Sequence, residues 1–442
     1  MTDALRALPA GWAETRLDRV ATVNARIGWK ALTASEYRTD GYAFLATPNI
    51  KKSEIDFSNV NYISEFRYNE SPELQLQVGD VLLAKDGNTL GIVNIIRHLP
   101  RAATVNGSIA VLRAFDMEPR FLRYIIQSSF IQGHINSVKD GMGVPHLFQR
   151  DIKRFTLPAP PIEEQCRIAD FLDAETARIN KLVAALQREL DLLVERRAAG
   201  VAAAVSGSTH ASRRNSTLAW LESVPTAWQE VRLGLLARMG SGHTPSRSHP
   251  EWWTDCTIPW ITTGEVKQVR DDRVEDLYET REKISELGLA NSAAELHPKG
   301  TVFLCRTASA GYSGVMGLDM ATSQDFVTWT CGPRLLPHYL LWCLRAMRPD
   351  LLGRLAMGST HKTIYVPDLQ MLRIPLPPLD EQEKIVPIIR RQNARIDTLT
   401  DRVRRQQELL RERRQALITA AVTGQFDVTT ASGRNVTEGV SA

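Results

Sequence analysis

The chain has 442 residues, of which 43% are hydrophobic and 24% are charged. This composition indicates a soluble globular protein of about two to four domains, and no apolar run approaches the roughly 18 residues of a membrane span. The 54 basic and 50 acidic side chains leave a net charge of +4, which permits a nucleic-acid partner without requiring one. The start, MTDALRALPAGW, lacks the apolar core of a signal peptide, and the five scattered cysteines contain no CxxC pair. We therefore expect a cytoplasmic protein without a disulfide framework or a zinc site.

In chain order, the sequence first predicts a mixed α/β domain. Short β-rich runs such as DVLLA and IAVLRAF lie between Gly, Asn and Pro turns, and an amphipathic helix begins at Pro119. A Pro-Pro pair then requires extended backbone, and a long helix over residues 162–206 ends at Gly207. The second half repeats this order, with a helix from Pro337, another Pro-Pro pair and a helix over residues 379–423. The predicted fold class is α+β, with two mixed α/β domains in tandem, each followed by a long helix.

Internal repetition supports this division. LPAGWAETRL returns as VPTAWQEVRL, and TLPAPPIEEQCRI returns as IPLPPLDEQEKI roughly 217 residues later. The second helix start also has a capping-box pattern, Asp380 with Glu383, which the first start lacks. The middles of the two halves share a hydrophobic rhythm but differ in polar residues, so the repeat predicts one scaffold with two different surfaces. The predicted boundaries are residues 1–161 and 208–378 for the domains, 162–207 and 379–424 for the helices, and 425–442 for a disordered tail.

Apolar residues at alternating three- and four-residue spacing predict that the two long helices pair as a coiled coil. About 45 residues would make a rod of about 65 Å. An antiparallel pair with Leu182 opposite Leu399 would set Glu175 against Gln406 and would give internal pseudo-twofold symmetry. It would also set Glu189 against Gln392. The alternative is that each helix is amphipathic and lies on its own domain. The predicted seam consists of Ile168, Leu172, Glu175, Ile179, Leu182, Leu186, Glu189, Leu193, Ile385, Ile389, Gln392, Ile396, Leu399, Val403, Gln406 and Leu410.

Sequence patterns for catalysis are missing. The chain has no GxxxxGK[ST] and no HExxH, and its nine histidines lack metal-ligand spacing. Glu265-Val266-Lys267 has the ExK spacing seen in nucleases, but no convincing acidic partner precedes it. Together with a duplicated scaffold, these absences favour recognition over reaction.

The paired blocks PAPPIEEQCRIADFLDAETARI and PLPPLDEQEKIVPIIRRQNARI carry a family resemblance. With WLESVPTAWQEVRLG and GHTPSRSHPEWW…IPWITTGEV, they make the chain resemble the specificity (S) subunit of a type I restriction–modification system from about Leu8 to Phe426. The last stretch is typical of one kind of target-recognition domain. The first domain, with FLATPNIKKSEIDFS, resembles the family more loosely.

The resemblance implies two target-recognition domains, each of which reads one half of an asymmetric bipartite target in double-stranded DNA. The long helices would set the spacer and dock two methyltransferase (M) subunits. The chain itself would be non-catalytic and would hold no cofactor or metal. S-adenosylmethionine would bind the M subunits, and ATP and Mg would bind a restriction (R) subunit, a further potential partner. No membrane is implied.

Readout of bases requires Arg, Lys, Asn, Gln, Ser or Thr side chains on loops, with further cations on phosphates. His146 and His361 occupy nearly equivalent places before the Pro-Pro pairs and are weaker candidates for phosphate contacts. Two other classes remain open, namely a stand-alone DNA-modifying enzyme and a coiled-coil scaffold without a DNA role. The candidate DNA-binding residues are Asn49, Lys51, Lys52, Lys85, Asn88 and Asn106 in the first domain, and Thr244, Ser246, Arg247, Thr263, Lys267, Arg306, Ser323 and Gln324 in the second.

Overall fold

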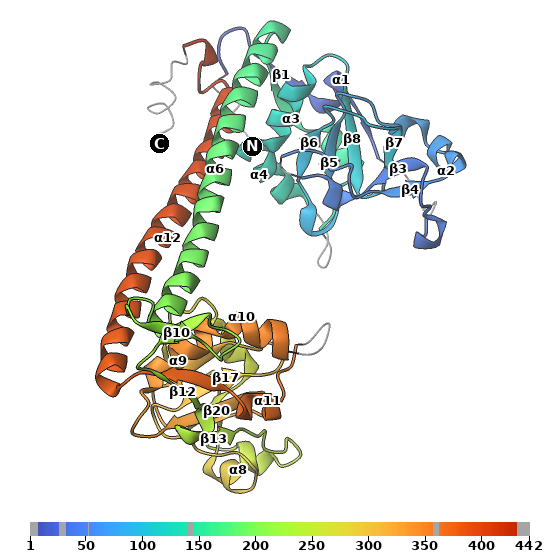
Figure 1. The fold of residues 1–442 in the computed structure, drawn as a ribbon. Helices are drawn as coiled ribbons and strands as arrows, with labels where there is room; N and C mark the ends of the chain where they lie inside the picture. The colour runs from blue at the N-terminus through green and yellow to red at the C-terminus, as the bar shows by residue number, and fades with distance from the viewer. Residues whose placement is uncertain (1–7, 26–31, 52, 140–144, 357–361, 431–442) are drawn as a thin grey trace. The chain divides into compact units, whose positions relative to one another are not determined.

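The computed structural model describes residues 8–25, 32–51, 53–139, 145–356 and 362–430 (Figure 1). Its contacts divide the chain into two compact units. Unit 1 combines Met1–Leu186 with Arg405–Ala442, and unit 2 is Gln187–Arg404. Each unit holds one mixed α/β domain and parts of both long helices, α6 (Ile162–Val205) and α12 (Leu379–Val422). Among the described residues, no helix has an apolar stretch long enough to cross a membrane.

Among the described residues, the domain of unit 1 contains a four-stranded sheet, a three-stranded sheet and a two-stranded pair. A separate antiparallel pair joins the domain's first and last strands, β1 (Ala13–Arg16) and β9 (Thr156–Ala159). The four-stranded sheet has the order β2 (Ala21–Asn24), β8 (Ile109–Ala114), β5 (Val81–Ala84), β6 (Val93–Ile95). The three-stranded sheet has the order β4 (Asn61–Ile63), β3 (Tyr42–Leu45), β7 (Ala103–Val105). The helices are α1 (Leu17–Val20), α2 (Glu65–Asn69), α3 (Pro119–Gln127), α4 (Ser129–Val138) and α5 (Gln149–Lys153).

The domain of unit 2 repeats this topology. Its five-stranded sheet has the order β13 (Ala237–Ser241), β20 (Phe326–Cys331), β17 (Val302–Cys305), β18 (Ser313–Met316), β15 (Asp276–Leu277). Its three-stranded sheet has the order β16 (Glu282–Ile284), β14 (Ile258–Ile261), β19 (Ala321–Thr322). Two further antiparallel pairs are β12 (Gln229–Arg232) with β21 (Arg373–Leu376) and β10 (Arg213–Asn215) with β11 (Ser223–Pro225). The helices are α7 (Val266–Val269), α8 (Glu286–Ala290), α9 (Pro337–Ala346), α10 (Arg348–Asp350) and α11 (Val366–Gln370).

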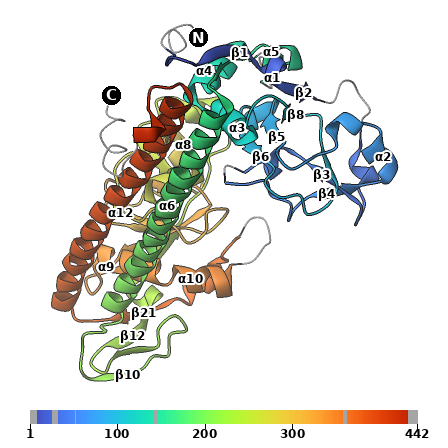
Figure 2. The same ribbon diagram turned by 90° about the horizontal axis from the view of Figure 1, so that it is seen from above.

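The topology confirms two mixed α/β domains on one plan, each followed by a long helix. Strands β13, β20, β17 and β18 take the places of β2, β8, β5 and β6, and β15 is an addition at the sheet edge. In unit 1, α3 lies between α6 and the four-stranded sheet (Figures 1 and 2). Its buried face, which includes Phe121, shares one core with Ile168 of α6 and Leu417 of α12. The helix pair is therefore continuous with the domain core.

A buried glutamine fixes the start of each long helix to its domain. In α6, Gln165 Nε2 donates to Pro160 O at 2.8 Å, and Gln165 Oε1 accepts from Glu118 N at 2.9 Å, just before α3. In α12, Gln382 repeats this contact, donating to Pro377 O at 3.0 Å and accepting from Leu336 N at 2.9 Å. These are the glutamines of the repeated EEQ and DEQ motifs. The motif therefore connects three parts of each domain: the strand that ends in Pro-Pro, the long helix and the helix before it.

The expected capping box at Asp380 is wrong. Helix α12 begins at Leu379, so Asp380 lies inside the first turn and cannot be the N-cap residue. Its carboxylate instead pairs with Lys384 at 2.9 Å, and the backbone N–H of Glu381 is bonded to Pro378 O. The proline before the helix supplies the acceptor that a side-chain cap would otherwise provide.

The end of each long helix packs on the opening motif of a domain. Gly207 after α6 has φ +63, and an added Cβ would meet Pro225 Cγ at 2.5 Å and Trp228 at 2.8 Å. Gly424 after α12 has φ +74 and faces Pro9 and Trp12 in the same way. The repeated Pro and Trp of LPAGW and VPTAW therefore form the seats on which the helix ends rest, and glycine is required at both seats.

Part of the predicted tail is ordered. Phe426 packs on Phe171 of α6, with ring centroids 5.6 Å apart, and Val428 packs against the core of unit 1. The prediction of disorder from residue 425 is therefore wrong for these two positions, because their apolar side chains pack against the hydrophobic core of unit 1. Residues 431–442 lie outside the described residues.

Helices α6 and α12 pair antiparallel, but not in the predicted register. In unit 1, Arg414 donates to Asn180 Oδ1 at 2.7 Å. In unit 2, Arg197 pairs with Asp397, which is the same pair of repeat positions and gives the expected internal symmetry of contacts. Gln392 was predicted opposite Glu189, but it covers Gly200, about three helical turns further along α6.

Half of the predicted seam is displaced by one residue. Leu172, Ile179, Leu193, Ile389, Ile396 and Val403 are buried as expected. Leu182 and Leu399 are 48% and 39% exposed, and Glu189 and Gln406 are also exposed. The next residues, Thr176, Asn393 and Gln407 among them, are buried instead. Between two buried positions seven residues apart, the next seam residue can lie three or four positions along the helix. Both choices give the same average spacing, so periodicity alone cannot decide which of the two neighbouring residues is buried.

Replacement of the junction glutamine should destabilise unit 2. We expect Gln382→Leu to lower the free energy of unfolding by about 2–4 kcal/mol, because three backbone groups, Leu336 N, Arg334 O and Pro377 O, lose their partner. Urea denaturation of the full chain, followed by circular dichroism, measures the change. Gln406→Leu on the exposed face of the same helix is the matched control and should have little effect. Equal stability of the two variants would contradict the assigned role.

Candidate nucleic-acid interface

Three loops of unit 1 meet where parallel strands β3 and β7 end. The backbone N–H of Asn106, after β7, donates to Leu45 O at the end of β3 at 2.9 Å. Lys85, after β5, donates its backbone N–H to Ser108 O at 2.8 Å. Carboxyl ends of parallel strands share one sheet edge, so residues 46–51, 85–90 and 106–108 form one cluster, called the unit 1 loop cluster.

Unit 2 builds the same cluster with the same backbone bonds. Ser323 N donates to Ile261 O at 2.9 Å, and Arg306 N donates to Asp325 O at 2.8 Å. The unit 2 loop cluster therefore comprises residues 262–267, 306–311 and 323–325. It places Lys267, Arg306 and Ser323 where unit 1 has Lys51, Lys85 and Asn106, all of them candidates chosen from sequence.

Some candidate DNA-binding side chains of unit 1 are exposed, whereas others form bonds within the protein. Lys51 and Asn88 are exposed. Lys85 is 7% exposed and its Nζ lies 3.1 Å from Asp86, whose other oxygen contacts His146. Asn106 Oδ1 accepts from Ser108 N at 3.1 Å and shapes its own loop. Lys52 and His361 lie outside the described residues.

Asn49 is a structural residue rather than a free reader of bases. It is 6% exposed, its Oδ1 accepts from Ala46 N at 2.8 Å, and its Nδ2 donates to Asp56 O and Asn59 O at 3.1 and 2.8 Å. We therefore correct its assignment, because its amide is fully used inside the loop. Glu265 has the equivalent position in unit 2 and is also buried, accepting from Arg281 N at 2.8 Å.

In unit 2, Gln324 organises its neighbours. Thr244 Oγ1 donates to Gln324 Oε1 at 2.6 Å, and Arg306 Nε donates to Gln324 O at 3.0 Å. Ser323 is buried at 3% exposure, with its hydroxyl 3.3 Å from Asp325, so its side chain supports the loop. Thr263 and Lys267 are exposed on the same cluster, as is Gln324 itself.

Arg247 lies on an aromatic support that the candidate set omitted. Its guanidinium lies 3.6 Å from the ring centroid of Trp253 and donates to Glu282 at 2.8 Å, although its side chain is 62% exposed. Trp253 Nε1 in turn donates to Ser246 O at 3.1 Å. An exposed arginine held in one orientation is suited to bidentate contacts with guanine or phosphate. The signal for this support was the Trp-Trp pair six residues after the arginine.

A buried cysteine lies next to the unit 2 loop cluster. Burial raises the pKa of the Cys305 thiol to about 11, so the thiol next to Arg306 stays protonated at neutral pH. Among the described residues, no group of three or more His, Cys, Asp or Glu side chains could hold a metal ion. The clusters present hydrogen-bond donors and cations on rigid strand ends, which suits recognition of a polyanion.

Comparison with known proteins places these features in a family. The family described as the type I restriction modification DNA specificity domain matches the chain twice, over residues 9–192 and 225–408. The two matches cover most of the chain, which therefore belongs to this family of DNA specificity domains. It is a type I specificity subunit with two target-recognition domains in tandem.

Individual relatives agree with this placement. The EcoKI specificity subunit of Escherichia coli is 23% identical over 95% of this chain and 90% of its own length. The StySPI specificity subunit of Salmonella potsdam is 26% identical, but its match spans only 52% of this chain and 49% of the relative. A solved chain from work on complex assembly and conformational transition of the type I R-M system aligns with a TM-score of 0.69 and 21% identity. That alignment covers 95% of this chain and all of the solved one, and at this identity it shows the shared fold alone.

The structural role of Asn49 is open to a direct test. We expect Asn49→Ala to lower the free energy of unfolding by about 2–4 kcal/mol, since three backbone groups lose a partner when the buried amide is removed. Asn88→Ala, at an exposed position in the same loop cluster, should change it by less than about 0.5 kcal/mol. Urea denaturation of both variants measures the difference. If Asn49→Ala is as stable as the parent protein yet alters the methylated first half-site, Asn49 contacts DNA after all.

Proposed function

We propose that each domain reads one half of an asymmetric bipartite target in double-stranded DNA. The observation that carries this proposal is the pair of loop clusters, which share a backbone frame and differ in side chains. Lys85 in one corresponds to Arg306 in the other, and Asn106 corresponds to Ser323. A common frame with different donors should recognise different base sequences.

Unit 2 also has Arg247 stacked on Trp253, an exposed cation suited to contacts with phosphate or guanine. In both clusters an exposed lysine, Lys51 or Lys267, supplies a cation for phosphates. Phosphate contacts of this kind position the domain, while the variable loop side chains specify the sequence.

The long helices set the spacer between half-sites and dock methyltransferase subunits in this proposal. Two features support it. Each helix is a continuous 44-residue element that belongs to both units. Several apolar side chains on the helices, such as Leu192 and Leu409, are left exposed at 62% and 47%, as a docking surface requires.

The chain is non-catalytic in this proposal. It recognises DNA, while S-adenosylmethionine binds the methyltransferase partner and ATP and Mg bind the restriction partner. The active assembly is then a DNA methylation complex with this chain as the reader.

Exchange of one domain should change one half-site. We expect replacement of residues 24–140 by the corresponding stretch of another specificity subunit to alter the first half-site and leave the second intact, because each loop cluster is built within one unit. Methylation-resolved sequencing of DNA from cells that co-express the methyltransferase reads both half-sites. The matched exchange over residues 239–357 should alter only the second. A single exchange that changes both half-sites would refute independent reading.

Lengthening both helices should lengthen the spacer. We propose duplicating residues 180–186 after Leu186 and residues 398–404 after Arg404, where the unit boundary crosses each helix. Seven residues preserve the heptad phase and add about 10 Å, or about three base pairs. The same methylation assay reads the spacer. Duplication in α6 alone is the control and should abolish methylation, because the two helix ends then lose their mutual register. An unchanged spacer in the double insertion would contradict the ruler.

A further inference from the structure

A cation-lined pocket lies in unit 1 between α3, α6 and the end of α12. Its volume is about 350 Å³. Three arginine side chains from separate parts of the chain line the pocket together with one carboxylate. Ser53, two residues beyond Lys51 of the unit 1 loop cluster, lines the same pocket. The polar side chains that line the pocket include Arg97, Arg123, Tyr124, Asp173, Asn180 and Arg414.

Arg123 is a buried guanidinium that forms no ion pair within the part of the chain that the structure describes. It is 8% exposed, and its Nε has no hydrogen-bond partner among those residues. Among the described residues, its closest interactions are with the neighbouring Tyr124, over whose ring its guanidinium lies at 4.4 Å. Burial is the main reason that the pKa of Arg123 is lowered; Arg97 also lowers it, whereas Tyr124 and Asp173 raise it. A buried charge in this condition is costly unless an anion meets it.

Among the described residues that line the pocket, Asp173 is the one carboxylate, and it already accepts hydrogen bonds from three side chains. Asp173 accepts from Tyr124 at 2.7 Å, from Arg97, and from Arg120 at 3.3 Å. Burial alone would raise the pKa of Asp173, but its bonds to Arg97 and Tyr124 hold it below its usual range. Arg414, which also lines the pocket, donates to the neutral Asn180, and its Nε has no hydrogen-bond partner among the described residues. The pocket therefore contains more positive charge than its own side chains balance.

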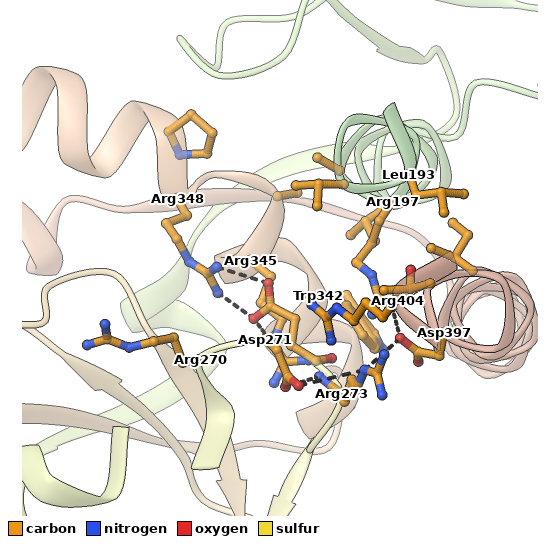
Figure 3. Close-up of a pocket in the computed structure, with 18 residues that line it drawn as sticks. Leu193, Arg197, Arg270, Asp271, Arg273, Trp342, Arg345, Arg348, Asp397 and Arg404 are labelled. Atoms are coloured by element: carbon orange, nitrogen blue, oxygen red, sulfur yellow. Dashed lines mark hydrogen bonds and ion pairs between the residues drawn. The ribbon is translucent and has the colours of Figure 1, made fainter. Parts of the chain in front are cut away.

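The corresponding pocket of unit 2 has carboxylates at positions where the unit 1 pocket has none. It lies between α9 and the helix pair, with a volume of about 360 Å³ (Figure 3). There the buried Arg345 faces Asp272 at 3.3 Å, and Arg348 makes a two-pronged pair with the same carboxylate at 2.7 and 2.9 Å. Asp397 pairs with Arg197 where unit 1 has Asn180. Unit 2 thus places a carboxylate beside each of these guanidinium groups, although Arg345 Nε and Arg197 Nη1 have no hydrogen-bond partner among the described residues.

We propose that the pocket lined by Arg97, Arg123 and Arg414 binds a phosphate group. A tetrahedral phosphate offers oxygens to guanidinium groups that approach from several directions, whereas a planar carboxylate satisfies one or two. The phosphate comes either from the DNA backbone or from a free phosphate in solution. The first source rests on the proposed function, and the position of Ser53 beside the loop cluster favours it. The second source does not depend on DNA binding.

The first test measures thermal unfolding of the full chain with inorganic phosphate, against sodium chloride at equal ionic strength. A ligand of the folded state raises the midpoint as its concentration rises. We expect Arg123→Leu to weaken phosphate binding about tenfold or more, since it removes a charged hydrogen-bond donor. Leu341 stands at the equivalent position of unit 2. Without phosphate, Arg123→Leu should be as stable as the parent or more stable, because it removes an unpaired buried charge. Arg178→Gln, an exposed arginine of α6 outside the pocket, should leave the phosphate response unchanged.

The second test identifies the source. DNA affinity is measured against salt for the complex with the methyltransferase, with and without Arg123→Leu. If a backbone phosphate enters the pocket, the variant should bind less tightly across sequences and the logarithmic salt slope should fall by about one. If DNA binding is unchanged while inorganic phosphate still stabilises the parent protein, the ligand is a free phosphate. A loss of stability in Arg123→Leu without phosphate would overturn the proposal. So would the absence of both the phosphate response and the change in salt slope. Failure of DNA binding by every form would count against the proposed function and would leave the phosphate measurement intact.

Discussion

A buried glutamine amide is the interaction on which the architecture depends. Gln165 and Gln382 each bond the carbonyl of the residue that opens a Pro-Pro pair and the N–H that precedes the domain's amphipathic helix. The amide side chain donates and accepts at once, which a carboxylate at the same place could not do at neutral pH. These bonds hold the start of each long helix against the strand that ends in Pro-Pro and against the helix before it.

The scaffold separates what must be constant from what must vary. Both loop clusters share the same backbone bonds between strand ends. Side chains at the cluster positions can therefore change without loss of the frame, as Lys85 and Arg306 do. The invariant parts are the glutamines, the glycines at the helix ends and the Pro and Trp seats. This division explains why the repeat is strong at domain edges and faint in the middles.

The sequence predicted the repeat, the helix starts and the shared domain plan because each of these leaves a mark at fixed spacing. It could not choose between Leu182 and Val183 for the seam, since both positions keep the same period and the choice depends on where the partner helix lies. Asn49 and Arg247 are both polar loop residues in sequence. Only the fold shows that one amide is consumed by backbone groups while the other side chain rests exposed on Trp253. The equivalence of Asn106 with Ser323 was equally hidden, because it is carried by backbone bonds between distant strands.

The seating of Gly424 against Pro9 and Trp12 has a consequence for the order in which the chain folds during synthesis. Unit 2 is one uninterrupted stretch, Gln187–Arg404, whereas unit 1 needs Arg405 and later residues to cover Ile168 and Leu172. The domain made first on the ribosome is therefore completed last, after its neighbour has emerged. Until then its apolar helix surface remains uncovered, and this reverses the usual vectorial order in which N-terminal domains finish first. A premature stop shortly after residue 404 would leave the second domain whole and the first without its lid of α12.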